Sequence, residues 1–235
     1  MAERWSLILD RARPGWENMA VDSALLDLAD REGAAFRRVY RWQPHCLSFG
    51  RHEPALQRYD AARIGALGLD CVRRPTGGRA VWHARELTYA VAAPLAAFGS
   101  LPRAYGAIHA MFAAVLESLG APATLAPPPA KISGLGSGPC FAAPVGGEVL
   151  LNGRKVLGSA QLRQRAAFLQ HGSLLLEDDQ SLVRALAGLS DGPAAETSLS
   201  GALGRAVTFG EAARSVIAVA EARFPGATRL LALPA

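Results

Sequence analysis

The chain has 235 residues, of which 50% are hydrophobic and 19% are charged, and its formal net charge is +5 at pH 7. These values are typical of a soluble globular protein with a sizeable core. The three cysteines, Cys46, Cys71 and Cys140, are odd in number and show no Cys-x-x-Cys spacing, which argues against a disulfide framework and a zinc site. We therefore expect a reducing, cytoplasmic location.

Residues 1–30 mix charged and apolar positions, and no stretch of the sequence has the length and apolar character of a membrane span. We expect neither a secretory signal nor a membrane partner. The positive net charge favours acidic partners. However, the arginines are scattered, and no basic run with interleaved aromatic residues is present, so a nucleic-acid partner is not expected.

Apolar periodicity and turn residues predict the elements of the first half of the chain. In order, we expect a strand at 5–9, a helix at 15–33, strands at 36–42 and 46–49, a helix at 55–67, strands at 71–74, 80–82 and 87–93, and a helix at 102–119. This irregular alternation predicts an α+β fold, in which helices pack on a mixed, largely antiparallel sheet.

The second half begins with residues 127–144, a long stretch without periodicity that is rich in Pro, Gly and Ser. We interpret it as a mobile loop that folds over a site. Asn152-Gly153 then predicts a hairpin, because this dipeptide favours a two-residue turn between strands. The remaining elements expected are strands at 148–151, 154–157, 167–169 and 173–176, and helices at 181–187 and 210–223.

A glycine turn follows the strand at 71–74. In Thr76-Gly77-Gly78 the two glycines can adopt positive φ and turn backbone N–H groups toward an anion or a carbonyl oxygen. A bare Gly-Gly pair is more often only a tight turn. Four possible donors or cations that could neutralise a phosphate-bearing ligand flank this pair: Arg73, Arg74, Arg79 and His83.

Cys140 and Lys155 are candidate reactive residues. Cys140 follows a glycine-rich run, so we expect its thiol in or near a loop, where a nearby ammonium or imidazole would lower the pKa of the thiol. The alternative is a buried cysteine that acts as a small hydrophobe, which fits Cys46 and Cys71 in their strand-like segments. Lys155 is one of only two lysines among the 25 basic residues. It suits an active site, although a lone lysine is often a solvated surface charge.

His171 interrupts an otherwise apolar strand, and it either packs as a hydrogen-bonded core residue or contacts a substrate. The five histidines form no Ser-His-Asp set and no His-x-x-x-His pair that can be assigned. A metal site is therefore not supported.

Three linked motifs resemble the lipoate-protein ligase and octanoyltransferase family, whose catalytic domain is similar in fold to that of biotin-protein ligase. They are Leu47 to Arg51, Arg73 to Tyr89 and Cys140 to Gly172. The resemblance implies one catalytic domain over residues 1–235, with no C-terminal accessory domain. It also implies a substrate-facing lysine at Lys155 and a lipoyl or octanoyl tunnel lined by the glycine turn. Beside that tunnel, the resemblance places the strand edge Gly158-Ser159-Ala160-Gln161.

Within this family the chain is closer to the octanoyltransferases. ATP-dependent ligases typically have a third glycine where this chain has Arg79, and an Asn-Asp pair that is absent here. Cys140-Phe141, followed by Pro144 and Glu148, resembles the loop in which octanoyltransferases place their cysteine nucleophile.

The expected function is octanoyl transfer from acyl carrier protein to a lysine of a lipoyl domain or of the glycine-cleavage H protein, through a thioester on Cys140. Lys155 and backbone donors near Gly77 and Gly78 would stabilise the oxyanion. No cofactor is expected. The alternatives are an ATP-dependent lipoate ligase, which would need ATP and Mg²⁺, and a noncatalytic protein that binds lipoylated or acylated partners.

Overall fold

A computed structural model of the protein describes residues 5–127, 146–177, 180–189, 194, 196–224 and 228–231. The helices are α1 (Gly15–Glu32), α2 (Ala55–Arg58), α3 (Ala61–Ala66), the short 3-10 helix η1 (Leu95–Ala97), α4 (Leu101–Ser118), α5 (Ser181–Leu186), α6 (Leu199–Leu203) and α7 (Phe209–Arg223). The strands are β1 (Trp5–Arg13), β2 (Ala35–Trp42), β3 (Cys46–Phe49), β4 (Asp70–Arg73), β5 (Val81–His83), β6 (Glu86–Pro94), β7 (Ala123–Leu125), β8 (Val149–Leu151), β9 (Arg154–Lys155), β10 (Leu157–Gln164), β11 (Ala167–Leu175) and β12 (Thr228–Leu231).

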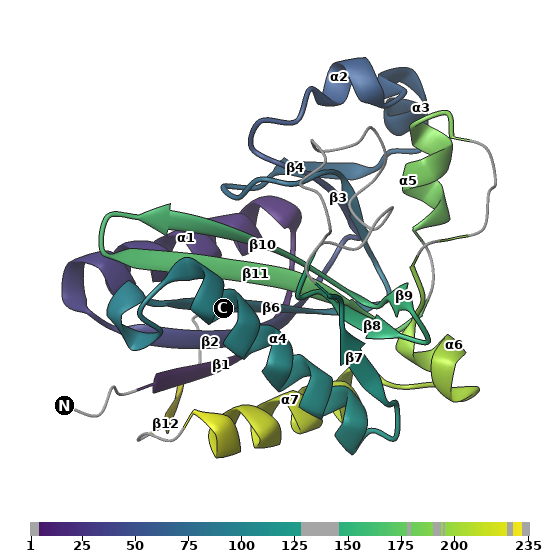
Figure 1. Ribbon diagram of the computed structural model, residues 1–235. Coiled ribbons are helices and arrows are strands. Elements are labelled where there is room, and N and C mark those ends of the chain that lie inside the picture. Colours follow the sequence, from purple (N-terminus) through teal and green to yellow (C-terminus); the bar gives the residue numbers. More distant parts are fainter. Residues whose placement is uncertain are drawn as a thin grey trace.

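The main sheet has six strands in the order β10-β11-β6-β2-β1-β12 (Figure 1). The neighbours from β10 to β2 are antiparallel, whereas β1 runs parallel to both β2 and β12. Two smaller sheets have the orders β4-β3-β5 and β7-β8-β9. The expected α+β fold with a mixed, largely antiparallel sheet is confirmed.

Helices cover both faces of the main sheet: α1 lies on one face, and α4 and α7 lie on the other (Figure 1). Strand β6 shows the sequence basis of this arrangement. Its residues Tyr89 and Val91 belong to the core under α4 and α7, while Ala90 and Ala92 belong to the core under α1. Successive strand residues point to opposite faces, so β6 is apolar along its whole length because both of its faces are buried.

The sheet β4-β3-β5 carries α2, α3 and α5 (Figure 1). Leu47 and Phe49 of β3 pack against Val183 and Leu186 of α5. This small sheet positions the glycine turn, because residues 74–80 connect β4 to β5. Because β5 leads almost directly into β6, the glycine turn lies beside the end of the main sheet at which β6 begins.

Four expected elements differ from the observed ones. The helix expected at 55–67 is two helices, because Asp60 caps α3 by accepting a hydrogen bond from the backbone of Arg63. The strands expected at 167–169 and 173–176 form one strand, β11, because His171 and Gly172 keep their place in the ladders with β10 and β6. The strand expected at 154–157 is divided: its first two residues form β9, and its last residue, Leu157, begins β10, which pairs with β11 as far as Gln164. The loop expected at 127–144 lies outside the described residues from 128 onward.

Two expectations about cysteine and glycine are corrected. Cys46 is buried, as the apolar alternative requires, but Cys71 is exposed, because it lies on the outer strand β4 of the small sheet. Gly78 has a φ of 94°, whereas Gly77 is absent from the glycines with positive φ. Only one of the two glycines in the turn therefore needs the left-handed conformation.

Candidate active site

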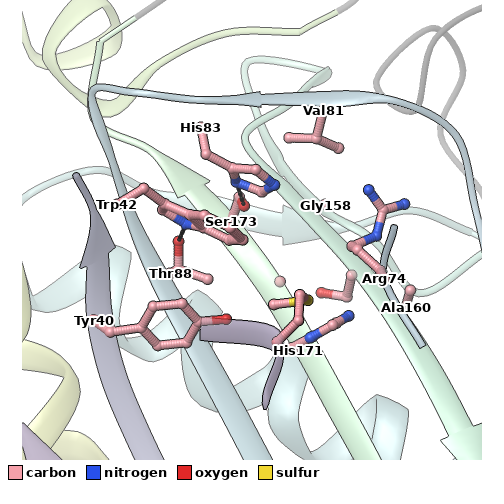
Figure 2. A pocket seen from close by; sticks show the side chains of 13 residues that line it. Tyr40, Trp42, Arg74, Val81, His83, Thr88, Gly158, Ala160, His171 and Ser173 are labelled. Atoms are coloured by element: carbon pink, nitrogen blue, oxygen red, sulfur yellow. Dashed lines mark hydrogen bonds between the residues drawn. The ribbon is translucent and has the colours of Figure 1, made fainter. Parts of the chain in front are cut away.

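A narrow pocket, open to solvent on one side, lies where the main sheet, the small sheet and the start of α1 meet (Figure 2). Strands β2, β5, β6, β10 and β11 supply most of its wall. The residues that line it are Met19, Tyr40, Trp42, Arg74, Val81, His83, Thr88, Gly158, Ser159, Ala160, His171, Gly172 and Ser173.

Arg74 fastens the glycine turn to the small sheet. Its Nη1 donates to the backbone oxygen of Ser48 at 2.9 Å and to Ser48 Oγ at 2.6 Å. Its Nη2 donates to the backbone oxygens of Gly77 at 3.2 Å and Arg79 at 2.8 Å. The guanidinium is buried, and these bonds give its planar donors fixed partners inside the protein.

Gly50 lets the turn approach β3 closely. A Cβ added at Gly50 would lie 1.9 Å from the backbone oxygen of Gly78, which no side chain can tolerate. Arg73 reinforces the same contact, because its Nη1 donates to the backbone oxygens of Gly50 at 2.6 Å and Glu53 at 3.0 Å. Arg73 thus serves the loop that follows β3 and is not among the residues that line the pocket.

His83 sits in a buried hydrogen-bonded cluster at one end of the pocket. Its Nε2 lies 2.5 Å from Ser48 Oγ, and its Nδ1 lies 2.7 Å from Glu86 Oε1. The imidazole stacks on Trp42, with 4.0 Å between the ring centroids. Glu86 Oε1 also accepts from Thr88 Oγ1 at 2.5 Å and from Ser173 Oγ at 2.9 Å. Figure 2 shows His83, Trp42, Thr88 and Ser173 gathered at this end.

His171 links the glycine turn to a buried charge network. Its Nε2 lies 2.6 Å from Thr76 Oγ1, and its Nδ1 lies 2.9 Å from Asp22 Oδ2. Asp22 also accepts from Arg38 Nη1 at 2.8 Å and from the Tyr40 hydroxyl at 2.9 Å. All of these side chains are buried.

Burial and neighbouring charges act in opposite directions on this network. Burial alone would raise the pKa of Asp22, but the hydrogen bond from His171 and the positive charge of Arg38 outweigh it, so this pKa is lowered. Burial lowers the pKa of His171 in spite of the favourable bond to Asp22. A neutral His171 therefore donates a hydrogen bond from Nδ1 to Asp22 and accepts one from the Thr76 hydroxyl at Nε2.

Lys155 lies on β9 and is 2% exposed. Its ammonium donates to Glu148 Oε1 at 2.5 Å. Thus the alternative of a solvated surface lysine is wrong: Lys155 is buried in an ion pair. Such a pair is held in place by geometry and further hydrogen bonds, because burial of a charge is costly. Lys155 is not among the residues that line the pocket.

The structure brings part of the expected site together. Of the residues expected from the sequence, those that line the pocket are Arg74, His83, Gly158, Ser159, Ala160 and His171. Thr76 adjoins them through His171. Gln161 points elsewhere, because its amide donates to the backbone oxygen of Leu101 and to Gln170 Oε1. Cys140 lies outside the described residues, so its distance from Lys155 stays untested.

Sequence reasoning missed most of the buried polar residues behind the wall. These are Asp10, Asp22, Arg38 and His109. Tyr40 and Trp42, which line the pocket itself, were missed as well. One local signal was available for Arg38, which stands in strand β2 between Arg37 and the apolar Val39. A charge in such a strand indicates a buried partner. The partners of Arg38 are Asp10 of β1 and Asp22 of α1, which are too far away in the sequence to be recognised from the segment around Arg38.

Among the described residues, no group of three or more His, Cys, Asp or Glu side chains could hold a metal ion. In the same part of the chain, every helix is too short or too polar to cross a bilayer.

The arrangement of this sheet and its helices is that of the lipoate-protein ligases. A solved lipoate-protein ligase A bound with ATP has a TM-score of 0.74 and 17% identity, and the match covers 100% of this chain and 90% of that one. The bipartite lipoate protein ligase from Thermoplasma acidophilum has a TM-score of 0.70 and 17% identity, covering 99% and 88%. Identities this low establish a common fold alone.

The sequence places the chain more closely. It belongs to the family of the lipoyl protein ligase A/B catalytic domain, whose model matches residues 14–221. Octanoyltransferase LipM of Symbiobacterium thermophilum is 37% identical over 245 residues, which cover 97% of this chain and 89% of the relative. Octanoyltransferase LipM of Brevibacillus brevis is 34% identical, covering 93% and 83%. The family resemblance seen in the motifs is confirmed, and the family is one of enzymes.

Proposed function

We propose that this protein is an octanoyltransferase that moves the acyl group from an acyl carrier protein to a lysine of a lipoyl domain or of the glycine-cleavage H protein. The name of the relatives that match most of the chain supports octanoyl transfer. The bipartite ligase of the same fold from Thermoplasma acidophilum, whose lipoylation system includes an E2 lipoyl domain, supports a lipoyl domain as the acceptor. The carrier donor agrees with the positive net charge of the chain.

The observation that carries the proposal is that the polar groups of the pocket wall are already hydrogen-bonded to other groups of the protein. Arg74 is bound to backbone carbonyls, His83 to Glu86 and Ser48, and His171 to Asp22 and Thr76. The hydroxyls of Thr88, Ser159 and Ser173 are likewise bound to other side chains. These groups are satisfied within the protein, so the wall suits an uncharged acyl chain better than a phosphate.

We propose Cys140 as the nucleophile. The two other cysteines are poorer candidates. Cys46 is buried, and burial together with the charge of Asp70 raises the pKa of its thiol. Cys71 is exposed, but the partial burial of its sulfur and the charge of Asp70 raise the pKa of this thiol as well. Their thiols are therefore held in the protonated, unreactive form at neutral pH. A free thiol nucleophile also fits a cytoplasmic enzyme.

The reaction has two steps. The thiolate of Cys140 attacks the carbonyl carbon of the carrier thioester, the bond from that carbon to the carrier sulfur breaks, and the carrier thiol leaves with a proton. The acceptor lysine, as a free amine, then attacks the new thioester. A C–N bond forms, the C–S bond to Cys140 breaks, and the amine proton returns to the thiolate. Lys155 and backbone N–H groups of the glycine turn would stabilise the oxyanion, where one donor commonly contributes about 3 kcal/mol.

No cofactor is needed in this scheme. A thioester is already activated, so its conversion to an amide runs downhill without ATP or Mg²⁺. The ligase alternative keeps one specific support, which is the common fold with a ligase bound to ATP. Against it, the guanidinium groups of Arg73 and Arg74 are bonded to backbone oxygens, which leaves fewer donors for an adenylate phosphate.

The test is to mix the purified protein with octanoyl-loaded acyl carrier protein and to seek the acyl adduct by mass spectrometry. The expected result is a hydroxylamine-sensitive adduct on Cys140, absent in Cys140→Ser and kept in the control Cys71→Ser. Addition of an apo lipoyl domain should then discharge the adduct. No adduct together with lipoate-dependent pyrophosphate exchange would favour the ligase. Binding of the lipoyl domain without turnover of any acyl donor would favour a noncatalytic protein.

A further inference from the structure

A second series of hydrogen-bonded side chains, all buried or half-buried, runs from the pocket wall to the turn that precedes β8. Tyr89 OH lies 2.8 Å from Ser159 Oγ, which in turn lies 2.8 Å from His109 Nε2. His109 Nδ1 lies 2.7 Å from the backbone oxygen of Gly147. Behind Tyr89, the amide of Gln170 donates to the phenol oxygen at 2.9 Å. Ser159 belongs to the pocket wall, so the series joins that wall to Gly147.

The donor direction of this series is fixed at its end. The carbonyl of Gly147 can only accept, so His109 must carry its proton at Nδ1. Burial keeps the imidazole neutral by lowering its pKa to about 4, so Nε2 is an acceptor and Ser159 donates to it. Because the Ser159 hydroxyl already donates its proton to His109, Tyr89 must be the donor in its bond to Ser159 Oγ. Each donor in the series therefore faces an acceptor, and all of the hydrogen bonds run in one direction, toward the Gly147 carbonyl.

Gly147 is held from two sides. Its N–H donates to the backbone oxygen of Ala126 at 2.8 Å, while its carbonyl accepts from His109. Its φ of 84° lies in the region that favours glycine, and the ring of Tyr105 packs on His109 with 3.9 Å between centroids. The next residue, Glu148, accepts from the ammonium of Lys155 at 2.5 Å.

We propose that His109 is a positioning residue: its hydrogen bond to the Gly147 carbonyl fixes the Gly147 peptide, and with it the Glu148–Lys155 ion pair, beside the pocket wall to which Ser159 belongs. The inference rests on the proposed function, in which Lys155 stabilises the oxyanion. The physical reason is that Glu148 follows Gly147 directly, so a rotation of the Gly147 peptide moves the carboxylate that holds Lys155. An error of about 1 Å in such a group can slow a reaction roughly 100-fold.

Two substitutions separate the two bonds of His109. His109→Asn keeps a nitrogen donor near the position of Nδ1, toward Gly147, and loses the acceptor for Ser159. His109→Gln keeps an oxygen acceptor near the position of Nε2 and loses the donor to Gly147. If the bond to Gly147 sets the ion pair, the Gln variant should be the impaired one. His45→Asn, at an exposed histidine, serves as the matched control.

The first measurement is kcat and KM for octanoyl-loaded carrier protein. We expect kcat of His109→Gln to fall roughly 10- to 100-fold with KM nearly unchanged, whereas His109→Asn and His45→Asn stay within about threefold of the wild type. Equal losses in the Asn and Gln variants, or a change confined to KM, would overturn the positioning role. A circular-dichroism melt confirms that each variant is folded.

The second measurement does not depend on turnover. The chain has only two lysines, Lys131 and Lys155, so acetic anhydride labelling can be followed at each by peptide mass spectrometry. We expect Lys155 to label roughly tenfold faster relative to Lys131 in His109→Gln, and at the wild-type ratio in His109→Asn. Equal ratios in all proteins would sink the inference, whatever the activity. A wild-type protein that labels as expected but transfers no octanoyl group would instead refute the proposed function.

Discussion

Replacement of His109 by Asn should remove a defined part of the acid sensitivity of the fold. Burial lowers the pKa of His109 from 6.5 to about 4. Between these two values the unfolded chain binds a proton that the folded protein does not, so acidification favours unfolding. The native state therefore has its full stability above pH 6.5 and loses it as the pH falls toward 4. Asn cannot titrate, so the variant lacks this contribution.

The size of this contribution to the unfolding free energy follows from the pKa shift of His109. A shift of one pKa unit corresponds to about 1.36 kcal/mol, so the wild type should lose roughly 2.5 kcal/mol more unfolding free energy than His109→Asn between about pH 7.5 and about pH 4.5. The lowered pKa of His171 acts in the same direction, but it is present in both proteins and cancels in the difference. Urea unfolding followed by tryptophan fluorescence at both pH values measures the quantity. Differences below about 0.5 kcal/mol between the two proteins would refute a neutral, buried His109.

Two further substitutions test the walls of the site by urea unfolding. Gly172→Ala should destabilise the protein by about 1–3 kcal/mol or more and close the pocket, because the new Cβ would lie 2.3 Å from the backbone oxygen of Gly158. Its control, Gly106→Ala, finds nothing within 4 Å and should gain about 0.5–1 kcal/mol in its helix; equal effects at the two sites would contradict the packing. Arg38→Met should cost about 3–5 kcal/mol, because it leaves Asp22 buried beside the pocket without its guanidinium partner. A loss below about 1 kcal/mol would mean that Asp22 takes up a proton at little cost.

Elements set by local chemistry could be predicted from the sequence. Asn152-Gly153 forms the expected hairpin turn, with φ values of 50° and 74° that such a turn requires. The helix expected at 102–119 is α4, capped by Ser100, whose side chain accepts from the backbone of Arg103. In both cases the residues that decide the structure are adjacent in sequence, so periodicity and capping were sufficient.

Elements that depend on partners distant in the sequence could not be predicted in this way. The residue pattern ends the expected strand at Leu157, and only the family resemblance implies a strand edge at 158–161, yet β10 pairs with β11 along its whole length to Gln164. Within the candidate site, the glycine turn, His83 and His171 were found because they belong to motifs. Arg38 was not, because its partners Asp10 and Asp22 are 28 and 16 residues away. A buried ion pair has no local signature beyond a charge in an apolar segment.

The same comparison explains why the sequence alone predicts Arg73, Arg74, Arg79 and His83 as groups that could neutralise a phosphate. Sequence shows which groups can donate, but only the fold shows which donors are already used. Arg74 is bound to the carbonyl oxygens of its own turn, and His171 is bound to Asp22 and Thr76. Once these groups are satisfied, a pocket that is polar in sequence offers few donors to a ligand. Its affinity must then come mainly from burial of apolar surface, at roughly 25 cal/mol per Å², which is the term by which an octanoyl chain would be recognised.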